Sequence, residues 1–185
     1  MRLRPLVLDD APRCAELEKV LFPGETPWPA RAFEQEIAAG HTTYWAVDVT
    51  VNRDGHNDNR DGHNDNRVDD NDKRVDDNDK RGELLGYAGV GRMGPAAWPE
   101  YEIRTIGVDP AAQRQGIARL MMDAIVELAD SQDAPIFLEV RVGNDPAIRL
   151  YEAYDFVING LRRNYYQPSG ADAHTMYRPR KSERC

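Results

Sequence analysis

The sequence predicts a mixed α/β domain in which strands and amphipathic helices alternate around one sheet. The stretch Tyr101 to Arg119 carries β-branched residues up to Val108, is interrupted at Asp109-Pro110, and then changes to a helical pattern. Apolar residues recur there at spacings of three and four, which line one helix face: Ile117, Leu120, Met121, Ala124, Leu128 and Ala129. The length of 185 residues is expected to form one domain, from 1 to 185, with a proper core.

An N-terminal strand and two helices are expected before the central stretch. The strand covers residues 2–8, and Pro5 predicts a sheet edge because proline lacks the N–H that a ladder needs. Asp9 or Asp10 can cap the first helix, whose core-facing stripe is Cys14, Leu17, Val20 and Leu21. The second helix covers residues 30–39 and ends at Gly40, a typical C-terminal cap.

The remaining elements alternate in the same way. Strands are predicted over residues 42–49, 83–93, 135–142, 156–166 and 174–178. In the strand 135–142, alternation places Ile136, Leu138 and Val140 on one face, and Phe137, Glu139 and Arg141 on the other. Asn144 can cap the helix that follows, and its apolar stripe is Ala147, Leu150, Tyr151 and Tyr154.

Residues 52–81 interrupt this regular pattern. The sequence NRDGHND occurs twice in succession from Asn52, and RVDDNDK occurs twice in succession from Arg67. This segment is rich in Asp and Asn and almost lacks apolar side chains, so it cannot bury enough surface to order itself. We predict a disordered, low-complexity extension of a hairpin loop. Its carboxylates and its histidines, His56 and His63, lack the ligand order of an EF-hand, so no metal site is expected.

Composition narrows the class of protein. The formal net charge of −8 argues against a direct nucleic-acid binder, and it permits an acidic face that attracts a basic protein. No apolar run is long enough to cross a membrane, and no secretory signal pattern is present, so no membrane partner is expected. Cys14 and Cys185 indicate neither a disulfide framework nor a metal knuckle, which favours a reducing, cytoplasmic setting.

The loop between the central strand and its helix has the features of a phosphate site. Free backbone N–H groups in the first helical turn and the helix dipole attract an anion, and Gly116 permits close approach. Arg114 and Arg119 add positive charge on either side. The dinucleotide fingerprint and the P-loop are both absent, so from the loop alone an ordinary β-turn-α connection is an equally good interpretation.

Two blocks of the sequence carry a family resemblance. The pattern strand–VDP–x-x-[QR]-x-x-G-x-[GA] resembles the acetyl-coenzyme A motif of the GCN5-related N-acetyltransferases, the GNAT family. EYEIRTIGVDPAAQRQGIARLMMDAI and LEVRVGNDPAIRLYEAYDF together resemble its RimI group, the N-terminal acetyltransferases of bacterial ribosomal proteins. The match covers nearly the whole chain apart from the insert. It implies the GNAT fold, a mixed and mostly antiparallel sheet that splays at the acetyl-coenzyme A site and is flanked by about four helices.

The resemblance implies a set of residues that bind acetyl-coenzyme A, with no metal. Backbone groups of Ile106, Gly107 and Val108 would bind pantetheine. The pyrophosphate would lie on the loop residues Arg114, Gln115, Gly116, Ile117, Ala118 and Arg119, where Ala118 replaces the second glycine of the motif. Asn144 aligns with a coenzyme A contact, although a helix cap alone would explain it. Gly107 permits a bulge or a close backbone approach, and the alternative is a slightly weakened strand.

The resemblance also implies two catalytic side chains. Glu139 aligns with the catalytic glutamate of the RimI group and is the predicted general base, and the alternative is an ion pair with Arg141 or Arg104. Tyr151 matches the tyrosine that acts as general acid toward the departing thiolate, although packing on the apolar stripe explains its ring equally well. Asp155 stands where the family usually has glycine, so it is expected to adopt a left-handed conformation at the helix end.

The resemblance also implies that three aromatic residues lie at the site of the acceptor amine. Trp28 borders the acceptor site in RimI-like enzymes, and packing of the N-terminal helices is the alternative. Tyr165 and Tyr166 belong to a segment that resembles the RimI RRNYY sequence beside the peptide site. Adjacent residues of a strand point to opposite faces, so at most one of the two tyrosines is expected to touch substrate.

Three functions remain open at this point. The first is acetylation of the N-terminal α-amine of a protein, with a ribosomal protein as the implied substrate. The second keeps the fold and changes the acceptor to a lysine, a polyamine or an antibiotic amine. The third is a non-catalytic module that binds acetyl-coenzyme A or a partner, and the resemblance implies the tRNA threonylcarbamoylation machinery as one such partner. The presence of Glu139, Tyr151 and Asn144 together favours an active enzyme.

Overall fold

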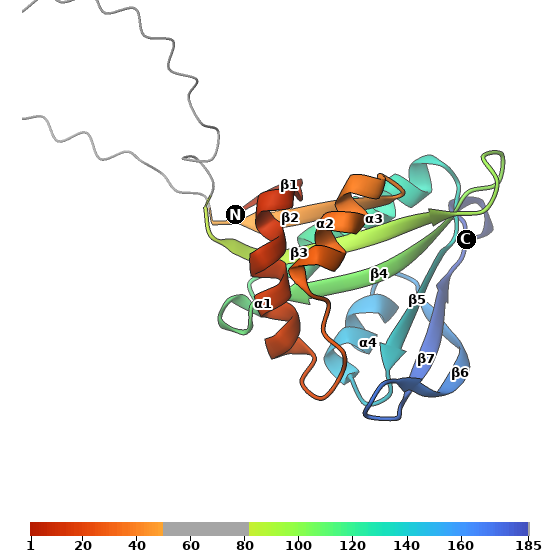
Figure 1. Cartoon of the computed structure of the whole chain (residues 1–185). Coiled ribbons are helices and arrows are strands. Elements are labelled where there is room, and N and C mark those ends of the chain that lie inside the picture. The colour runs from red at the N-terminus through yellow and green to blue at the C-terminus, as the bar shows by residue number, and fades with distance from the viewer. Residues whose placement is uncertain (50–81, 185) are drawn as a thin grey trace, which may run out of the picture.

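The computed structural model describes residues 1–49 and 82–184, and the repeated segment 52–81 lies outside the described residues (Figure 1). The strands of the described residues are β1 (Arg2–Pro5), β2 (Thr42–Asp48), β3 (Leu84–Met93), β4 (Glu100–Val108), β5 (Ile136–Arg141), β6 (Val157–Tyr166) and β7 (Ala171–Arg178). The α-helices of this part of the chain are α1 (Ala11–Leu21), α2 (Ala30–Ala39), α3 (Ile117–Ser131) and α4 (Asp145–Glu152). None of these helices is long and apolar enough to cross a membrane.

The strands form one sheet in the order β1-β2-β3-β4-β5-β7-β6. Every neighbouring pair is antiparallel except β4 and β5, which run parallel. The connection between those two strands contains α3, because parallel neighbours need a crossover segment. The predicted mixed and mostly antiparallel sheet with four flanking helices is therefore confirmed for the described residues.

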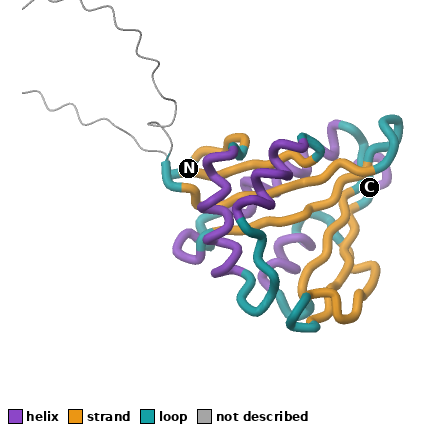
Figure 2. The backbone as a smooth tube through the Cα atoms, in the orientation of Figure 1, coloured by secondary structure: helices purple, strands orange, loops and turns teal. Residues whose placement is uncertain are grey.

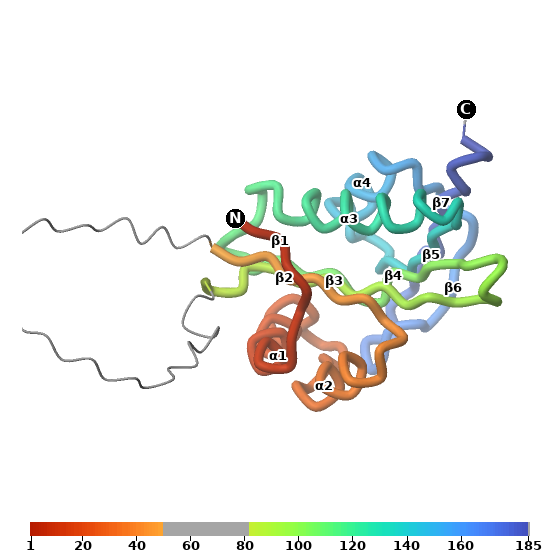
Figure 3. The backbone as a smooth tube through the Cα atoms, turned by 90° about the horizontal axis from the view of Figure 1, so that it is seen from above, coloured from red at the N-terminus to blue at the C-terminus, as the bar shows by residue number. Residues whose placement is uncertain are grey.

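The helices lie in two groups on opposite faces of the sheet (Figures 2 and 3). Helices α1 and α2 cover one face, where Leu17, Phe33 and Tyr87 belong to one buried apolar cluster. Helices α3 and α4 cover the other face, where Met121 and Ile125 belong to a second cluster. The sheet thus separates two apolar cores. A ligand can enter between its strands only where two neighbouring strands stop pairing.

Strands β4 and β5 diverge part of the way along their length. They pair only from Tyr101–Ile136 to Ile103–Leu138. Opposite this point, Val90 pairs with Ile103 and Gly89 with Thr105, so Arg104 is an extra residue in β4. A bulge of this kind bends a strand and raises its twist, which re-aims the rest of β4 away from β5. The splayed sheet that the family resemblance implied is confirmed, and the bulge at Arg104 lies directly after the last β4–β5 pair.

Several local predictions are confirmed. Pro5 lies in the edge strand β1, and Gly40 closes α2 in the left-handed conformation with φ 69°. The Asn144 side chain caps α4 by accepting a hydrogen bond from the Ala147 N–H at 3.4 Å. Asp155 adopts the predicted left-handed conformation at the end of α4, with φ 66°.

Other local predictions are wrong at the N-terminal edge. Strand β1 ends at Pro5 rather than residue 8, because Leu8–Asp10 form a 3-10 turn. Asp10 precedes α1, but its side chain makes no capping bond there. It binds the Arg4 guanidinium at 2.7 and 2.9 Å instead, since a charged partner outcompetes a helix N–H. Val20 is 60% exposed, so the core stripe of α1 consists of Cys14, Leu17 and the half-buried Leu21.

Candidate active site

A cavity of about 1290 Å³ lies where β4 and β5 separate. Its walls come from α1 and the loop after it, from β4 and the loop before α3, and from β5, α4 and the end of β6. One end contains the Gly116 loop, and the other end contains Trp28, Tyr165 and Tyr166. A single cavity therefore joins the residues predicted for the donor with those predicted for the acceptor.

The loop before α3 has the geometry of an anion cradle. Gly116 is left-handed with φ 86°, and a Cβ built there would meet no heavy atom within 4 Å. The first N–H groups of α3 follow it and have no partner within the helix, so they are free to bind an anion. Arg114 is also left-handed, with φ 62°, which turns successive peptide groups toward one side. The loop thus presents backbone donors and open space in the same place.

The base of this loop is fixed by Asp109. Its carboxylate accepts a hydrogen bond from the Ala111 N–H at 2.8 Å and forms an ion pair with Arg13. The residues that line the cavity here are Gln113, Arg114, Gly116, Ile117, Ala118 and Arg119. The prediction included Gln115, which does not line the cavity, and it missed Gln113.

Gly107 lies on the cavity wall with Ile106 and Val108, as predicted. No bulge occurs at this residue, since Gly107 pairs regularly with Tyr87 and the bulge lies at Arg104. A Cβ at Gly107 would lie 2.8 Å from the Leu21 Cδ1 atom and 2.8 Å from the Tyr87 ring. Glycine is therefore required here for close packing across the sheet face. On its β5 side this part of β4 has no pairing strand, which leaves backbone groups to face the cavity.

Glu139 lines the cavity from the middle of β5 and is half-buried. Its Oε1 atom lies 3.2 Å from the Arg162 guanidinium, which comes from β6. The sequence offered Arg141 or Arg104 as ion-pair partners of Glu139, and both are wrong. Arg141 pairs with Glu25 at 2.7 Å, and Arg104 forms no ion pair with Glu139 among the described residues. Burial raises the pKa of the Glu139 carboxyl above its usual range, and the Arg162 charge only partly opposes this. A carboxylate with a raised pKa is a stronger base than an exposed one.

Tyr151 and Asn144 line the cavity from α4. Tyr151 is 5% exposed, and its ring packs against Phe156 with centroids 5.8 Å apart. Burial, with a smaller contribution from Tyr166, raises the pKa of its phenol well above the usual value. No described residue forms a hydrogen bond with its hydroxyl group. Tyr151 therefore both packs in the core and lines the cavity. Asn144 both caps α4 and lines the cavity.

The predicted acceptor residues also meet at the cavity. Trp28 packs on Phe33 with ring centroids 5.5 Å apart, and it lines the cavity as well. Tyr165 and Tyr166 both line it, although alternation along a strand places only one of them there. Strand β6 changes register between Arg162 and Tyr166, and Asn164 is left-handed with φ 51°. That irregularity breaks the alternation and brings both rings to one side.

The loop after α1 reaches the loop between β6 and β7 across this end of the cavity. Glu25 and Pro168 form an isolated β-bridge, and the Thr26 hydroxyl donates a hydrogen bond to the Gln167 carbonyl at 3.3 Å. The Glu25–Arg141 ion pair also connects the loop after α1 to the end of β5. These contacts close one side of the acceptor end, so an acceptor group enters from a restricted direction.

Two glutamates of the cavity wall were not predicted. Glu18 is 4% exposed, and its carboxylate accepts hydrogen bonds from the Tyr87 hydroxyl at 2.6 Å and the Thr105 hydroxyl at 3.1 Å. Glu18 lies four residues after Cys14, on the core-facing side of α1, so the helical spacing in the sequence already indicated a buried carboxylate. Glu102 lies on β4 and is half-buried. The sequence of β4 alone does not indicate that Glu102 faces the cavity, because this depends on how β4 pairs with β5.

Charge is distributed unevenly along the cavity. Arg114, Arg119 and Arg149 line the end with the anion cradle. The acceptor end contains the carboxylates Glu18, Glu25, Glu102 and Glu139 together with Arg104 and Arg141. Basic groups near the cradle suit phosphates, and carboxylates at the far end suit an ammonium group. Across the part of the chain that the structure describes, no group of three His, Cys, Asp or Glu side chains is arranged to hold a metal ion.

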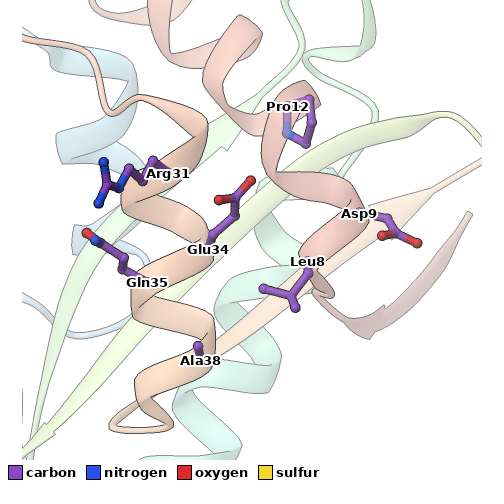
Figure 4. A pocket seen from close by; sticks show the side chains of 7 residues that line it. All are labelled: Leu8, Asp9, Pro12, Arg31, Glu34, Gln35 and Ala38. Carbon is purple, nitrogen blue, oxygen red and sulfur yellow. The ribbon is translucent and has the colours of Figure 1, made fainter.

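A second hollow of about 600 Å³ lies between the start of α1 and helix α2 (Figure 4). The lining side chains come from both elements: Leu8, Asp9, Pro12, Arg31, Glu34, Gln35 and Ala38. In Figure 4, Arg31 and Gln35 point away from α1, and Glu34 points toward it. This hollow contains no residue of the Gly116 loop or of β5, so it contributes nothing to the candidate site.

Comparisons with known proteins agree with this geometry. The model of the acetyltransferase (GNAT) family matches residues 41–156. The chain is 41% identical to the N-alpha-acetyltransferase RimI of Mycobacterium tuberculosis (strain ATCC 25618 / H37Rv), over 91% of this chain and 86% of that protein. It is 43% identical over 68 residues to the ribosomal protein bS18-alanine N-acetyltransferase of Escherichia coli (strain K12), which is 36% of this chain and 46% of that protein.

The solved structures share the fold. The crystal structure of the ribosomal-protein-S18-alanine N-acetyltransferase from Escherichia coli matches with a TM-score of 0.64 and 23% sequence identity. The match covers 96% of this chain and 92% of that chain. The two chains therefore share one overall fold.

Proposed function

The chain belongs to the acetyltransferase (GNAT) family, and we propose that it transfers an acetyl group from acetyl-coenzyme A to the N-terminal α-amine of a protein. The observation that carries this proposal is the placement of Glu139. It is a half-buried carboxylate on the wall of a cavity that also contains the anion cradle. A base and a donor site that share one cavity can bring an amine and a thioester together, and such alignment accounts for a large part of the rate.

The donor end suits acetyl-coenzyme A. Backbone N–H groups at the start of α3 and the guanidinium groups of Arg114 and Arg119 would bind the pyrophosphate. Backbone groups of Ile106 to Val108 face the gap left by β5 and would bind pantetheine and polarise the thioester oxygen. The fit of the loop is supported by the open space at Gly116. Gln115 lies in the same loop but is not among the residues that line the cavity.

The acceptor starts as an ammonium group, so it loses two protons: one before it attacks and one from the nitrogen after the C–N bond has formed, and the departing thiolate takes up the second. Glu139 takes a proton from the α-ammonium group and becomes a neutral carboxylic acid. The neutral amine then attacks the carbonyl carbon, and the C–N bond forms as the C–S bond breaks. The Tyr151 hydroxyl donates a hydrogen bond to the departing sulfur, which stabilises the thiolate. The raised pKa of this phenol favours such a hydrogen bond over full proton transfer.

An α-amine is favoured over a lysine for two reasons. Its pKa is near ~8, against roughly 10.4 for lysine, so a carboxylate removes its proton with less difficulty. The links between Glu25, Thr26 and the β6–β7 loop close one side of the acceptor end. Acetylation of a lysine or a small-molecule amine, and binding without turnover, are the competing functions.

We propose a ribosomal protein as the substrate. The support is the 41% identity to a RimI N-alpha-acetyltransferase and the resemblance to enzymes named for ribosomal protein bS18 alanine. Such a substrate would be met in the cytoplasm. Association with the tRNA threonylcarbamoylation machinery remains a separate prediction, which co-purification from cells tests directly.

Mass spectrometry of peptides tests the proposed function. We expect the protein to add one acetyl group to N-terminal peptides of ribosomal proteins when acetyl-coenzyme A is present. The matched control peptide has a blocked N-terminus and one internal lysine. Acetylation of the control peptide and not of the free N-terminus would establish the lysine reading, and modification of neither would refute the enzyme.

Replacement of Tyr151 by phenylalanine is expected to lower turnover by roughly 10–100-fold, the loss of one hydrogen bond to a charged group. The phenylalanine ring preserves the packing on Phe156, so the fold should persist. The deficit should not vary between about pH 6 and 9, because the phenol stays protonated there. Steady-state rates across this range provide the measurement. A deficit that disappears at high pH would contradict a role at the leaving group.

A further inference from the structure

Glu102 is a half-buried carboxylate on the cavity wall whose charge has no partner among the described residues. The other carboxylates of this end are engaged: Glu18 accepts hydrogen bonds from Tyr87 and Thr105, and Glu25 pairs with Arg141. Within residues 1–49 and 82–184, the Glu102 side chain forms neither a hydrogen bond nor an ion pair. Partial burial of an unpaired charge costs free energy, so a cation from outside the chain would be bound favourably there.

The strand register places Glu102 beside Glu139. Glu102 pairs with Phe137 across the parallel β4–β5 ladder, and Glu139 is two residues beyond Phe137 on the same strand. Paired residues and residues two apart share one face of a sheet, so both carboxylates project from the same face. Both also line the same cavity. The bulge at Arg104 follows directly, so the two side chains lie where the strands begin to separate.

The two carboxylates affect each other electrostatically. Burial is the main cause of the raised pKa of Glu139, and the negative charge of Glu102 raises it further. The cation beside Glu139 is Arg162, whose side chain is 58% exposed and which also lies over the Tyr165 ring at 5.6 Å. Counted over this end, the four carboxylates Glu18, Glu25, Glu102 and Glu139 face three guanidinium groups, those of Arg104, Arg141 and Arg162, which leaves an excess of one negative charge. An ammonium group placed between Glu102 and Glu139 would neutralise it.

We propose that Glu102 and Glu139 form a carboxylate pair that binds the α-ammonium group of the substrate, in which Glu102 holds the cation and Glu139 accepts its proton. This assignment rests on the proposed function. It gives the two residues different tasks: Glu102 contributes to recognition of a charged acceptor, and Glu139 carries out the proton transfer. In the complex, the substrate ammonium group takes the place beside Glu139 that the Arg162 guanidinium occupies without substrate.

The pH behaviour of Glu139 depends on all the groups around it. They are Glu102 and Arg104 of β4, Arg141 of β5, Arg162, Tyr165 and Tyr166 of β6, and Glu18 and Glu25 from α1 and the loop after it, while β7 places Thr175, which does not titrate, opposite Glu139. Removal of the Glu102 charge removes a like charge, so the pKa of Glu139 should fall. The acid limb of the pH–rate profile should therefore move to lower pH.

Binding without turnover separates recognition from chemistry. The protein is saturated with coenzyme A, which lacks an acetyl group, and binding of one N-terminal peptide is measured by calorimetry in parallel with the same peptide carrying an N-acetyl group. In Glu102→Gln, we expect affinity for the free peptide to fall about tenfold, the typical effect of losing one charge-assisted contact. Affinity for the acetylated peptide should stay the same, because that peptide carries no α-ammonium group.

Glu100→Gln is the matched control, since Glu100 lies two residues earlier on β4 and does not line the cavity. It should leave both affinities and the acid limb unchanged. Equal losses for the free and acetylated peptides in Glu102→Gln, or no loss for either, would overturn the carboxylate pair. So would an acid limb that stays at the wild-type pH. Failure of the wild-type protein to bind or acetylate the free peptide would instead refute the proposed function.

Discussion

Replacement of Glu139 by glutamine is expected to lower turnover by roughly 10²–10⁴, the range that general-base catalysis supplies. Glutamine is nearly isosteric and keeps the side chain on the same face of β5. It cannot take a proton, so the variant depends on acceptor molecules that are already neutral. Binding of acetyl-coenzyme A should be unaffected, because Glu139 lies at the acceptor end of the cavity, away from the Gly116 loop.

The pH dependence identifies the role of Glu139. As the pH rises through the α-amine pKa near ~8, solvent deprotonates the acceptor and the deficit of Glu139→Gln should shrink. The wild-type rate should fall at low pH as the Glu139 carboxylate becomes protonated. Since its pKa is raised by burial, this loss should begin at a higher pH than for an exposed glutamate. Rates of both proteins with one N-terminal peptide across this range provide the test.

Two outcomes would change the assignment of Glu139. A deficit that stays constant with pH would demote the residue from base to positioning group. A wild-type rate would remove it from the site. Thermal protection by acetyl-coenzyme A serves as the control for folding, since it should be the same in the variant and in the wild-type protein.

Replacement of Gly116 by valine is expected to abolish the thermal protection that acetyl-coenzyme A gives to the wild-type protein. A ligand that binds only the folded state raises its stability by mass action, so the shift reports binding. Valine has two effects at this residue. Its Cβ and methyl groups would occupy the open space in which the pyrophosphate is expected, and its branched side chain disfavours φ 86°.

Gly40→Val separates these two effects. Gly40 is also left-handed, with φ 69° and no heavy atom within 4 Å of a built Cβ, but it closes α2 and does not line the cavity. Both variants should be destabilised without ligand, by roughly 1–2 kcal/mol for one left-handed residue. Only Gly116→Val should lose the shift on addition of acetyl-coenzyme A, measured by a melting curve. An unchanged shift in Gly116→Val would refute the anion cradle.

The sequence by itself determined the order and type of the main elements. The β-branched run before Asp109, the helical periodicity after Gly116 and the alternation around Glu139 all reflect interactions within one segment. Such local signals also predicted the Gly40 and Asn144 caps, whereas the left-handed Asp155 was implied by the family resemblance. The predicted helix cap failed at Asp10. Its carboxylate pairs with Arg4, which also pairs with Asp48, a residue distant in sequence.

Only the tertiary structure decided which side chains share the cavity. Strands β4 and β5 separate where a bulge occurs at Arg104, and nothing in a single strand fixes the register with its neighbour. The same register places Glu102 beside Glu139, and an irregularity in β6 brings both Tyr165 and Tyr166 to one side. These features depend on contacts between segments far apart in the chain, so periodicity and propensity within one segment do not contain them.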